Sequence, residues 1–211
     1  MTVKKYILTL IIAITLPFAT KAQTFVEGSV GYIPFEENSG DIPSHGGISM
    51  QFQYGKFVTN YKMRSVSLTV NKLEYNNPDI NYTSINGVTG NFHSTINTRA
   101  TAYRLGYERK GTFGNSEFDD TWQYYNIVNY HLTMLVIKES YSDPTVVFQD
   151  KRSAGTYISP DIEFGLGMAR KFNQKAYLYT EARIYMPIIG ELIYYTGIGF
   201  RFNAGVRYFL R

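Results

Sequence analysis

The chain has 211 residues, of which 44% are hydrophobic, 16% aromatic and only 18% charged, and it contains no cysteine. This length is sufficient for one domain with its own core, and the composition excludes an intrinsically disordered chain. The absence of cysteine excludes disulfides, thiolate metal ligands, cysteine nucleophiles and lipid attachment to an N-terminal cysteine.

The formal net charge of +4 is concentrated at the N-terminus. Lys4, Lys5 and Lys21 fall within residues 1–22, a segment without acids, and the other residues carry 18 basic against 17 acidic groups. The remaining charge is therefore close to zero, and it gives no support for a nucleic-acid partner.

Residues 1–22 have the pattern of a cleaved secretory signal peptide. Lys4 and Lys5 form a positive region, Tyr6–Phe18 is apolar, and Thr20 and Ala22 are small residues at the −3 and −1 positions before Gln23. The apolar stretch is shorter than the ~20 residues of a membrane-spanning helix. We expect export, cleavage, and a mature domain of residues 23–211.

The mature domain alternates apolar and polar residues with a period of two, which is the signature of β-strands. In the last segment Phe200, Phe202 and Val206 alternate with Arg201, Asn203 and Arg207. Eight such segments occur in chain order, near residues 26–32, 48–54, 65–71, 98–109, 126–137, 161–168, 176–186 and 198–210. We expect strands of about 9–11 residues, the length of a tilted membrane-crossing strand.

The connections alternate in length, as in an outer-membrane barrel. Those near 59–63 and 172–175 are short, whereas those at 33–46, 76–96, 138–156 and 187–196 are long and polar. The connection at 110–124 lies on the short side but is too long for this pattern. The pattern alone gives no explanation for it beyond an excursion on the inner side.

The polar faces are expected to point into the barrel, because they combine small glycines with charges of both signs that neighbouring strands can pair. The expected set of charges in the lumen is Glu27, Arg104, Glu108, Asp161, Glu163, Glu181, Arg183, Arg201 and Arg207. The closing strand would present Ile198, Phe200, Phe202, Val206 and Tyr208 to lipid. The alternative is a soluble exported lipocalin-like barrel with inverted faces and an apolar ligand inside.

Closing the barrel pairs the last strand with the first, antiparallel. Glu27 lies near the start of the first strand and Arg207 near the end of the last. We therefore expect a closing ion pair between them, with Glu181 and Arg183 meeting Arg201 and neighbouring acids further along the lumen.

With its signal peptide, eight alternating strands and a closing strand that carries Tyr208 and Phe209 near its end, the chain resembles the small eight-stranded outer-membrane β-barrels of Gram-negative bacteria. The resemblance covers residues 23–211 and identifies no subfamily. It implies an all-β, antiparallel up-and-down transmembrane barrel in the outer membrane. Outer-membrane lipid and the barrel-insertion machinery are the partners it implies. The chain ends in Leu210 and Arg211 rather than in an aromatic residue, which is a departure from the class.

Sequence motifs for catalysis, nucleotide binding or metal binding are absent, and no cofactor or metal is expected. His45 and His93 fall in expected outer loops, and His131 is expected inside the barrel, with no serine next to it in the sequence. The sequence favours a non-enzymatic scaffold that meets an extracellular or envelope partner through loops 33–46, 76–96 and 138–156. A lipid-modifying acyl hydrolase or transferase is the alternative.

Overall fold

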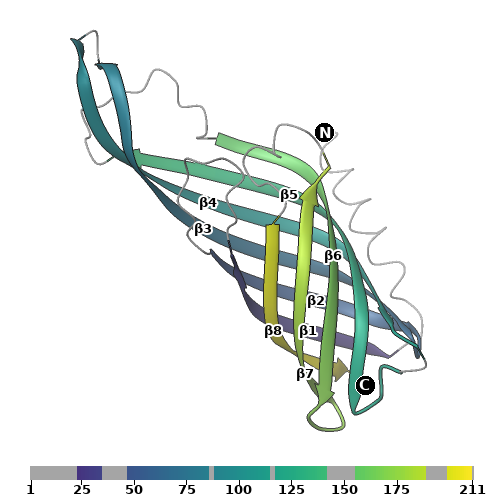
Figure 1. The fold of residues 1–211 in the computed structure, drawn as a ribbon. Coiled ribbons are helices and arrows are strands. Elements are labelled where there is room, and N and C mark those ends of the chain that lie inside the picture. The colour runs from purple at the N-terminus through teal and green to yellow at the C-terminus, as the bar shows by residue number, and fades with distance from the viewer. Residues whose placement is uncertain are drawn as a thin grey trace, which may run out of the picture.

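The computed structural model describes residues 23–34, 47–85, 88–114, 117–141, 155–188 and 199–210. Their eight strands pair in chain order, and the last closes on the first to form an antiparallel barrel (Figure 1). The strands are β1 Thr24–Ile33, β2 Gly47–Thr59, β3 Lys62–Ile85, β4 Val88–Thr112, β5 Trp122–Tyr141, β6 Gly155–Lys171, β7 Ala176–Pro187 and β8 Gly199–Leu210. The predicted fold class is confirmed. The expected signal peptide, residues 1–22, lies outside the described residues.

The two ends of the barrel differ. Short turns join β2 to β3 and β6 to β7 at the end where β1 begins and β8 finishes. Since barrels of this type place their short turns on the periplasmic side, we call this the periplasmic end and the opposite one the outer end. No helix of the described residues is long and apolar enough to cross a membrane.

Strand lengths depart from the expected 9–11 residues. Strands β3, β4, β5 and β6 have 24, 25, 20 and 17 residues, so the expected loop at 76–96 is mostly strand and that at 138–156 is shorter than predicted. The β3–β4 hairpin projects beyond the other strands (Figure 1). Alternation marks a strand only where one face meets an apolar medium, so the pattern stops at the membrane boundary while the backbone ladder continues. The expected loop segments 35–46 and 189–196 lie outside the described residues.

On each strand one row of apolar residues faces outward. Phe202, Leu166 and Leu132 are 53%, 59% and 53% exposed, and the outer surface carries many other large apolar side chains. On the closing strand, Val206 and Tyr208 are exposed as well and Phe200 is partly exposed, whereas Ile198 lies outside the described residues. The soluble lipocalin-like alternative is wrong, because such an exterior is stable only in a lipid bilayer.

The interior is arranged in three layers. At the periplasmic end an apolar cluster fills the barrel, and it includes Phe25, Met63, Phe118, Tyr125 and Phe209. At the outer end a second cluster contains Ile33, Leu73, Leu135, Ile137 and Tyr185. The buried charged residues occupy the space between them. An eight-stranded barrel is just wide enough for side chains to fill it, and here two apolar clusters and the charged residues between them occupy the interior.

Candidate functional site

The candidate site is the network of buried charges in the lumen. The five acids Glu27, Glu108, Asp161, Glu163 and Glu181 and the five bases Arg104, Lys110, Arg183, Arg201 and Arg207 are each at most 4% exposed. Nine of these residues are the predicted lumen charges, and the tenth is Lys110. Each points inward because it follows the inward parity of its strand. We call these ten residues the lumen lattice.

At the periplasmic side of the lattice, Glu27 joins two cations. The guanidinium of Arg207 donates to one carboxylate oxygen, and the register places these two residues directly opposite each other on β8 and β1. The other oxygen, Oε2, accepts from Lys110 Nζ at 2.5 Å. Lys110 Nζ also lies 2.8 Å from Glu181 Oε1, so it links β1 to β7 across the lumen.

Arg183 is the central cation of the lattice. Its guanidinium donates to Glu181, to Glu108 Oε2 at 2.6 Å and to Glu163 Oε2 at 3.0 Å. Arg201 Nη2 lies 2.7 Å from the other oxygen of Glu163. Glu163 therefore connects Arg183 to Arg201, and among the described residues no ion pair joins Glu181 to Arg201 directly.

Arg104 and Asp161 belong to the outer side of the lattice. Arg104 Nε lies 3.8 Å from Asp161 Oδ2, and its guanidinium carbon is 4.0 Å from the centre of the Tyr185 ring. Asp161 Oδ2 also accepts from the hydroxyl of Thr133 at 2.5 Å. Hydrogen bonds and a cation–π contact thus accompany this ion pair.

His131 faces the lumen, where its Nε2 lies 3.2 Å from Glu163 Oε2. A serine does lie near it, although not in sequence: a Cβ placed on Gly106 would be 2.6 Å from both Ser67 Oγ and His131 Nδ1. Ser67 accepts instead from Asn129 Nδ2 at 3.1 Å, and it is fully buried. These side chains are shielded from the lipid face, where an acyl-chain enzyme would need its nucleophile and base.

Close approach of aromatic rings explains two glycines of the inner face. A Cβ on Gly167 would lie 2.5 Å from the Tyr125 ring, and one on Gly199 would lie 2.1 Å from the ring of Tyr185. The Tyr125 and Tyr185 rings pack directly against the backbone of these glycines, beside the charged side chains. Tyr125 also donates from its hydroxyl to Glu181 Oε1 at 3.0 Å, which ties the packing to the lattice.

The long connection between β4 and β5 closes the periplasmic mouth. It runs over 113–121, shorter than the expected 110–124, and it inserts Phe118, which is 1% exposed, into the apolar cluster. Phe118 N donates to Asn60 O at 2.9 Å, and the Phe118 and Phe57 ring centres are 5.8 Å apart. We call this connection the plug.

Gln123 couples the plug to the lattice. Its side-chain nitrogen donates to the carbonyl of Phe118, and its Oε1 accepts from Arg207 Nη1 at 2.9 Å. The excursion that the sequence leaves unexplained is therefore a cap on the charged interior.

On its exposed side an ion pair between Asp119 and Lys171, which we call the latch, also holds the plug to β6. Lys171 Nζ lies 2.7 Å from Asp119 Oδ1, which accepts from the hydroxyl of Tyr177 at 3.3 Å as well. The hydrogen bond from Lys171 lowers the pKa of the Asp119 carboxyl below its ordinary value of 3.8. A carboxyl with a lowered pKa stabilises the folded form above its unfolded pKa, and this stabilisation is lost as the pH falls through the folded value.

We expect Lys171→Gln to return the pKa of Asp119 toward its ordinary value. In the wild type, the latch should open only as the pH falls below about 4. Because the Asp119 carboxylate is mostly exposed to solvent, the effect of the pair on total stability should stay below ~1 kcal/mol. An NMR titration of the Asp119 carboxyl in nanodiscs measures this directly. A pKa that is the same with and without Lys171 would contradict the latch.

Among the described residues, no group of three or more histidine and acidic side chains is arranged to hold a metal ion. The lumen lattice is instead a charge-balanced set of ion pairs. Its five acids are matched by five bases, and each acid has a cationic neighbour. Such an arrangement fixes side chains and excludes bulk water.

Closed eight-stranded topology, an apolar exterior and a charged, filled interior define a small transmembrane β-barrel of the outer-membrane type. No protein-family model matches the chain, and no curated protein matches it. The chain does match solved structures. Neisserial surface protein A matches with a TM-score of 0.51 and 13% identity, over 88% of this chain and 96% of that one.

A second match is Ail, the attachment invasion locus protein of Yersinia pestis, solved with the heparin analogue sucrose octasulfate. Its TM-score is 0.52 at 6% identity, over 90% of this chain and 100% of that chain. Both are solved bacterial proteins, and at these identities they show that the fold is shared. The expected resemblance to small outer-membrane barrels of Gram-negative bacteria is confirmed.

Proposed function

We propose that the protein is a non-enzymatic, non-conducting scaffold of the outer membrane that presents its outer segments to a partner. The filled lumen is the observation that carries this proposal. The lattice crosses the barrel between two apolar clusters, and the plug covers the periplasmic mouth. A barrel with such an interior has little space for a path of water, in contrast to porins of 16 or more strands.

The β3–β4 hairpin supports a role at the outer end. It extends the sheet beyond the apolar belt, where a crossing of the membrane does not require it (Figure 1). Long outer segments on a rigid scaffold are a common location for recognition.

The sequence of the outer segments indicates the chemistry of the partner. Residues 35–46, 75–97, 142–154 and 189–198 contain seven acids and two bases. Ail was solved with a sulfated heparin analogue. Because like charges repel, we expect a neutral or cationic partner for this chain rather than a polyanion.

We expect the purified barrel to show no steady ion conductance in a planar bilayer at neutral pH. As a matched variant, Glu108, Glu163, Arg183 and Arg201 are all replaced by serine, which leaves the net charge unchanged and removes the centre of the lattice. This variant should conduct, because its lumen would admit water. Steady conductance by the wild-type barrel would refute the proposal.

A further inference from the structure

The lipid-facing surface of the barrel carries a cluster of cations near the periplasmic end. On β3 the outward residues Val66, Leu68 and Val70 are preceded by Lys62 and Arg64. On β4 the outward residues Tyr103, Leu105 and Tyr107 are followed by Arg109, which is exposed. The apolar stripe of both strands thus ends in cations, at the level where lipid tails give way to headgroups.

Arg64 and Arg109 are direct register partners on β3 and β4. Like charges opposite each other on one face of a sheet destabilise it. Among the described residues neither arginine, nor Lys62, has an ion pair with a carboxylate. The nearby acid Glu117 accepts hydrogen bonds from Tyr61 and Asn60. An anion from outside the chain would therefore be stabilised here.

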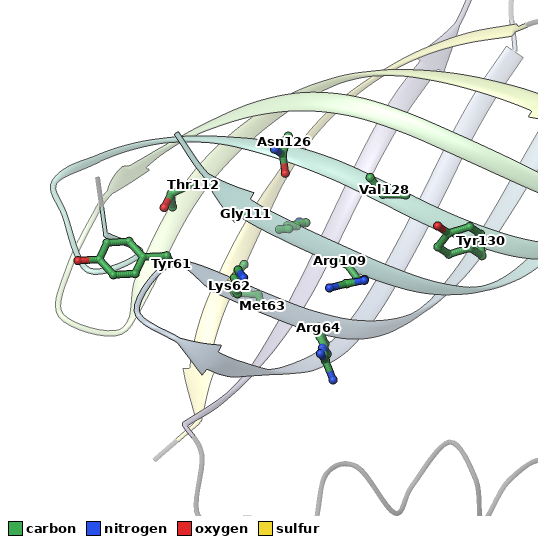
Figure 2. Close-up of a pocket in the computed structure, with 11 residues that line it drawn as sticks. Tyr61, Lys62, Met63, Arg64, Arg109, Gly111, Thr112, Asn126, Val128 and Tyr130 are labelled. Carbon is green, nitrogen blue, oxygen red and sulfur yellow. The ribbon is translucent and has the colours of Figure 1, made fainter. Parts of the chain in front are cut away.

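A hollow of about 360 Å³ lies among these cations. Its lining includes Lys62, Arg64, Arg109, Asn126 and Tyr130, and Figure 2 shows the arginines on neighbouring strands. The hollow exists in part because Gly111, between Lys62 and Asn126 in the register, has no side chain. A Cβ at this position would approach only Asn126 Oδ1, at 3.2 Å, as a close neighbour.

We infer that this hollow binds the phosphate headgroup of an anionic phospholipid in the periplasmic leaflet. Two guanidinium groups and an ammonium group supply the charge and the paired donors that a phosphate requires. Asn126 adds an amide. The next outward row contains Val66, Tyr107 and Tyr130, so acyl chains continue onto an apolar surface directly beyond the headgroup. This apolar continuation favours a lipid over a free phosphate ion.

The site is separate from the proposed scaffold function, which depends on the opposite end of the barrel. It faces the periplasmic leaflet, and its cationic side chains Lys62, Arg64 and Arg109 follow the outward parity of β3 and β4, opposite to the inward parity of Lys110 and the rest of the lumen lattice. It would hold the barrel at a fixed depth and rotation relative to the lipid around it.

The test is native mass spectrometry of the mature protein in a neutral detergent, with phosphatidylglycerol or phosphatidylcholine added. We expect the wild type to retain phosphatidylglycerol about tenfold more tightly than phosphatidylcholine. The double variant Arg64→Gln/Arg109→Gln should lose this preference. Gly111→Val should weaken it too, because its branched side chain occupies the part of the hollow between Lys62 and Asn126 without a change of charge.

Arg170→Gln is the matched control. Arg170 is an exposed cation at the same end of the barrel, but it stacks on Trp122, with its guanidinium carbon 5.3 Å from the ring centre, and it does not line the hollow. Its replacement should leave the preference unchanged. Heat-modifiable gel mobility shows whether each variant is folded. If the double arginine variant does not fold, Gly111→Val alone tests the headgroup site.

Three results would overturn the inference. The first is a preference retained in folded Gly111→Val. The second is an equal loss in Arg170→Gln, which would indicate a diffuse charge effect. The third is full displacement of the lipid by millimolar inorganic phosphate, which would show a site for the free anion.

Discussion

Replacement of Glu27 by glutamine should destabilise the folded barrel by about 3–5 kcal/mol, the cost of removing one partner from a buried ion pair. Glu27 contacts both Arg207 and Lys110, so its neutralisation leaves two cations short of a partner in a confined space. Lys110 retains Glu181 and Glu108, whereas Arg207 has no other carboxylate within ion-pair distance among the described residues. Refolding into lipid vesicles, titrated with urea, measures the free energy.

The double variant Glu27→Gln/Arg207→Met should be less destabilised than Glu27→Gln alone, because it leaves no stranded guanidinium. A suitable surface control is Glu74→Gln. Glu74 pairs with Arg99 at 3.2 Å, but both side chains are more than 70% exposed, and loss of such a pair costs less than ~1 kcal/mol. A coupling between Glu27 and Arg207 below ~0.5 kcal/mol would contradict the closing pair, because distant sites show as much.

Replacement of Phe202 by arginine should destabilise the barrel by up to about 2–4 kcal/mol, the cost of an arginine on the lipid face inside the bilayer. Phe202 lies on β8, is 53% exposed and has its register partner Tyr32 on the same outer face. An arginine there would have no lumenal acid within reach, because it points away from the lattice. The same vesicle titration applies.

Tyr208→Arg is the matched control for depth. Tyr208 lies on the same face of β8, two residues from its periplasmic end. Since the cost of a charge falls toward ~0–1 kcal/mol near the interface, this variant should be close to wild type. Equal effects at the two positions would mean that the outer face of β8 does not cross a bilayer.

The sequence was sufficient to predict the fold and the face of each strand. Alternation has a period of two, so once one residue of a strand is known to face lipid the others follow. This is why Glu27, Glu181 and Arg207 could be assigned to the lumen without coordinates. The pairing of Glu27 with Arg207 followed from closure of the barrel, which requires the first strand to pair with the last.

What the sequence missed lies where the alternation ends. Lys110 continues the inward parity of Glu108, and the predicted lumen set of five acids and four bases was short of one base. The inward parity and the missing base could both have identified Lys110, had the predicted strand not ended at Arg109. Phe118 gave no such signal, because a side chain in an irregular connection follows no period. Its burial depends on the shape of the mouth, which only the assembled barrel defines.

The central claim is that the apolar faces meet lipid and the polar faces enclose a packed interior. It is tested most directly by NMR contacts between lipid chains and leucine and isoleucine methyl groups in nanodiscs. Leu68, Leu132 and Leu166 are more than half exposed, whereas Leu135 and Ile127 are 1% exposed. We predict strong contacts from acyl-chain protons to the first three and none to the other two. Contacts to Leu135 and Ile127, with none to Leu68, Leu132 and Leu166, would show that the barrel is inverted and contradict the account.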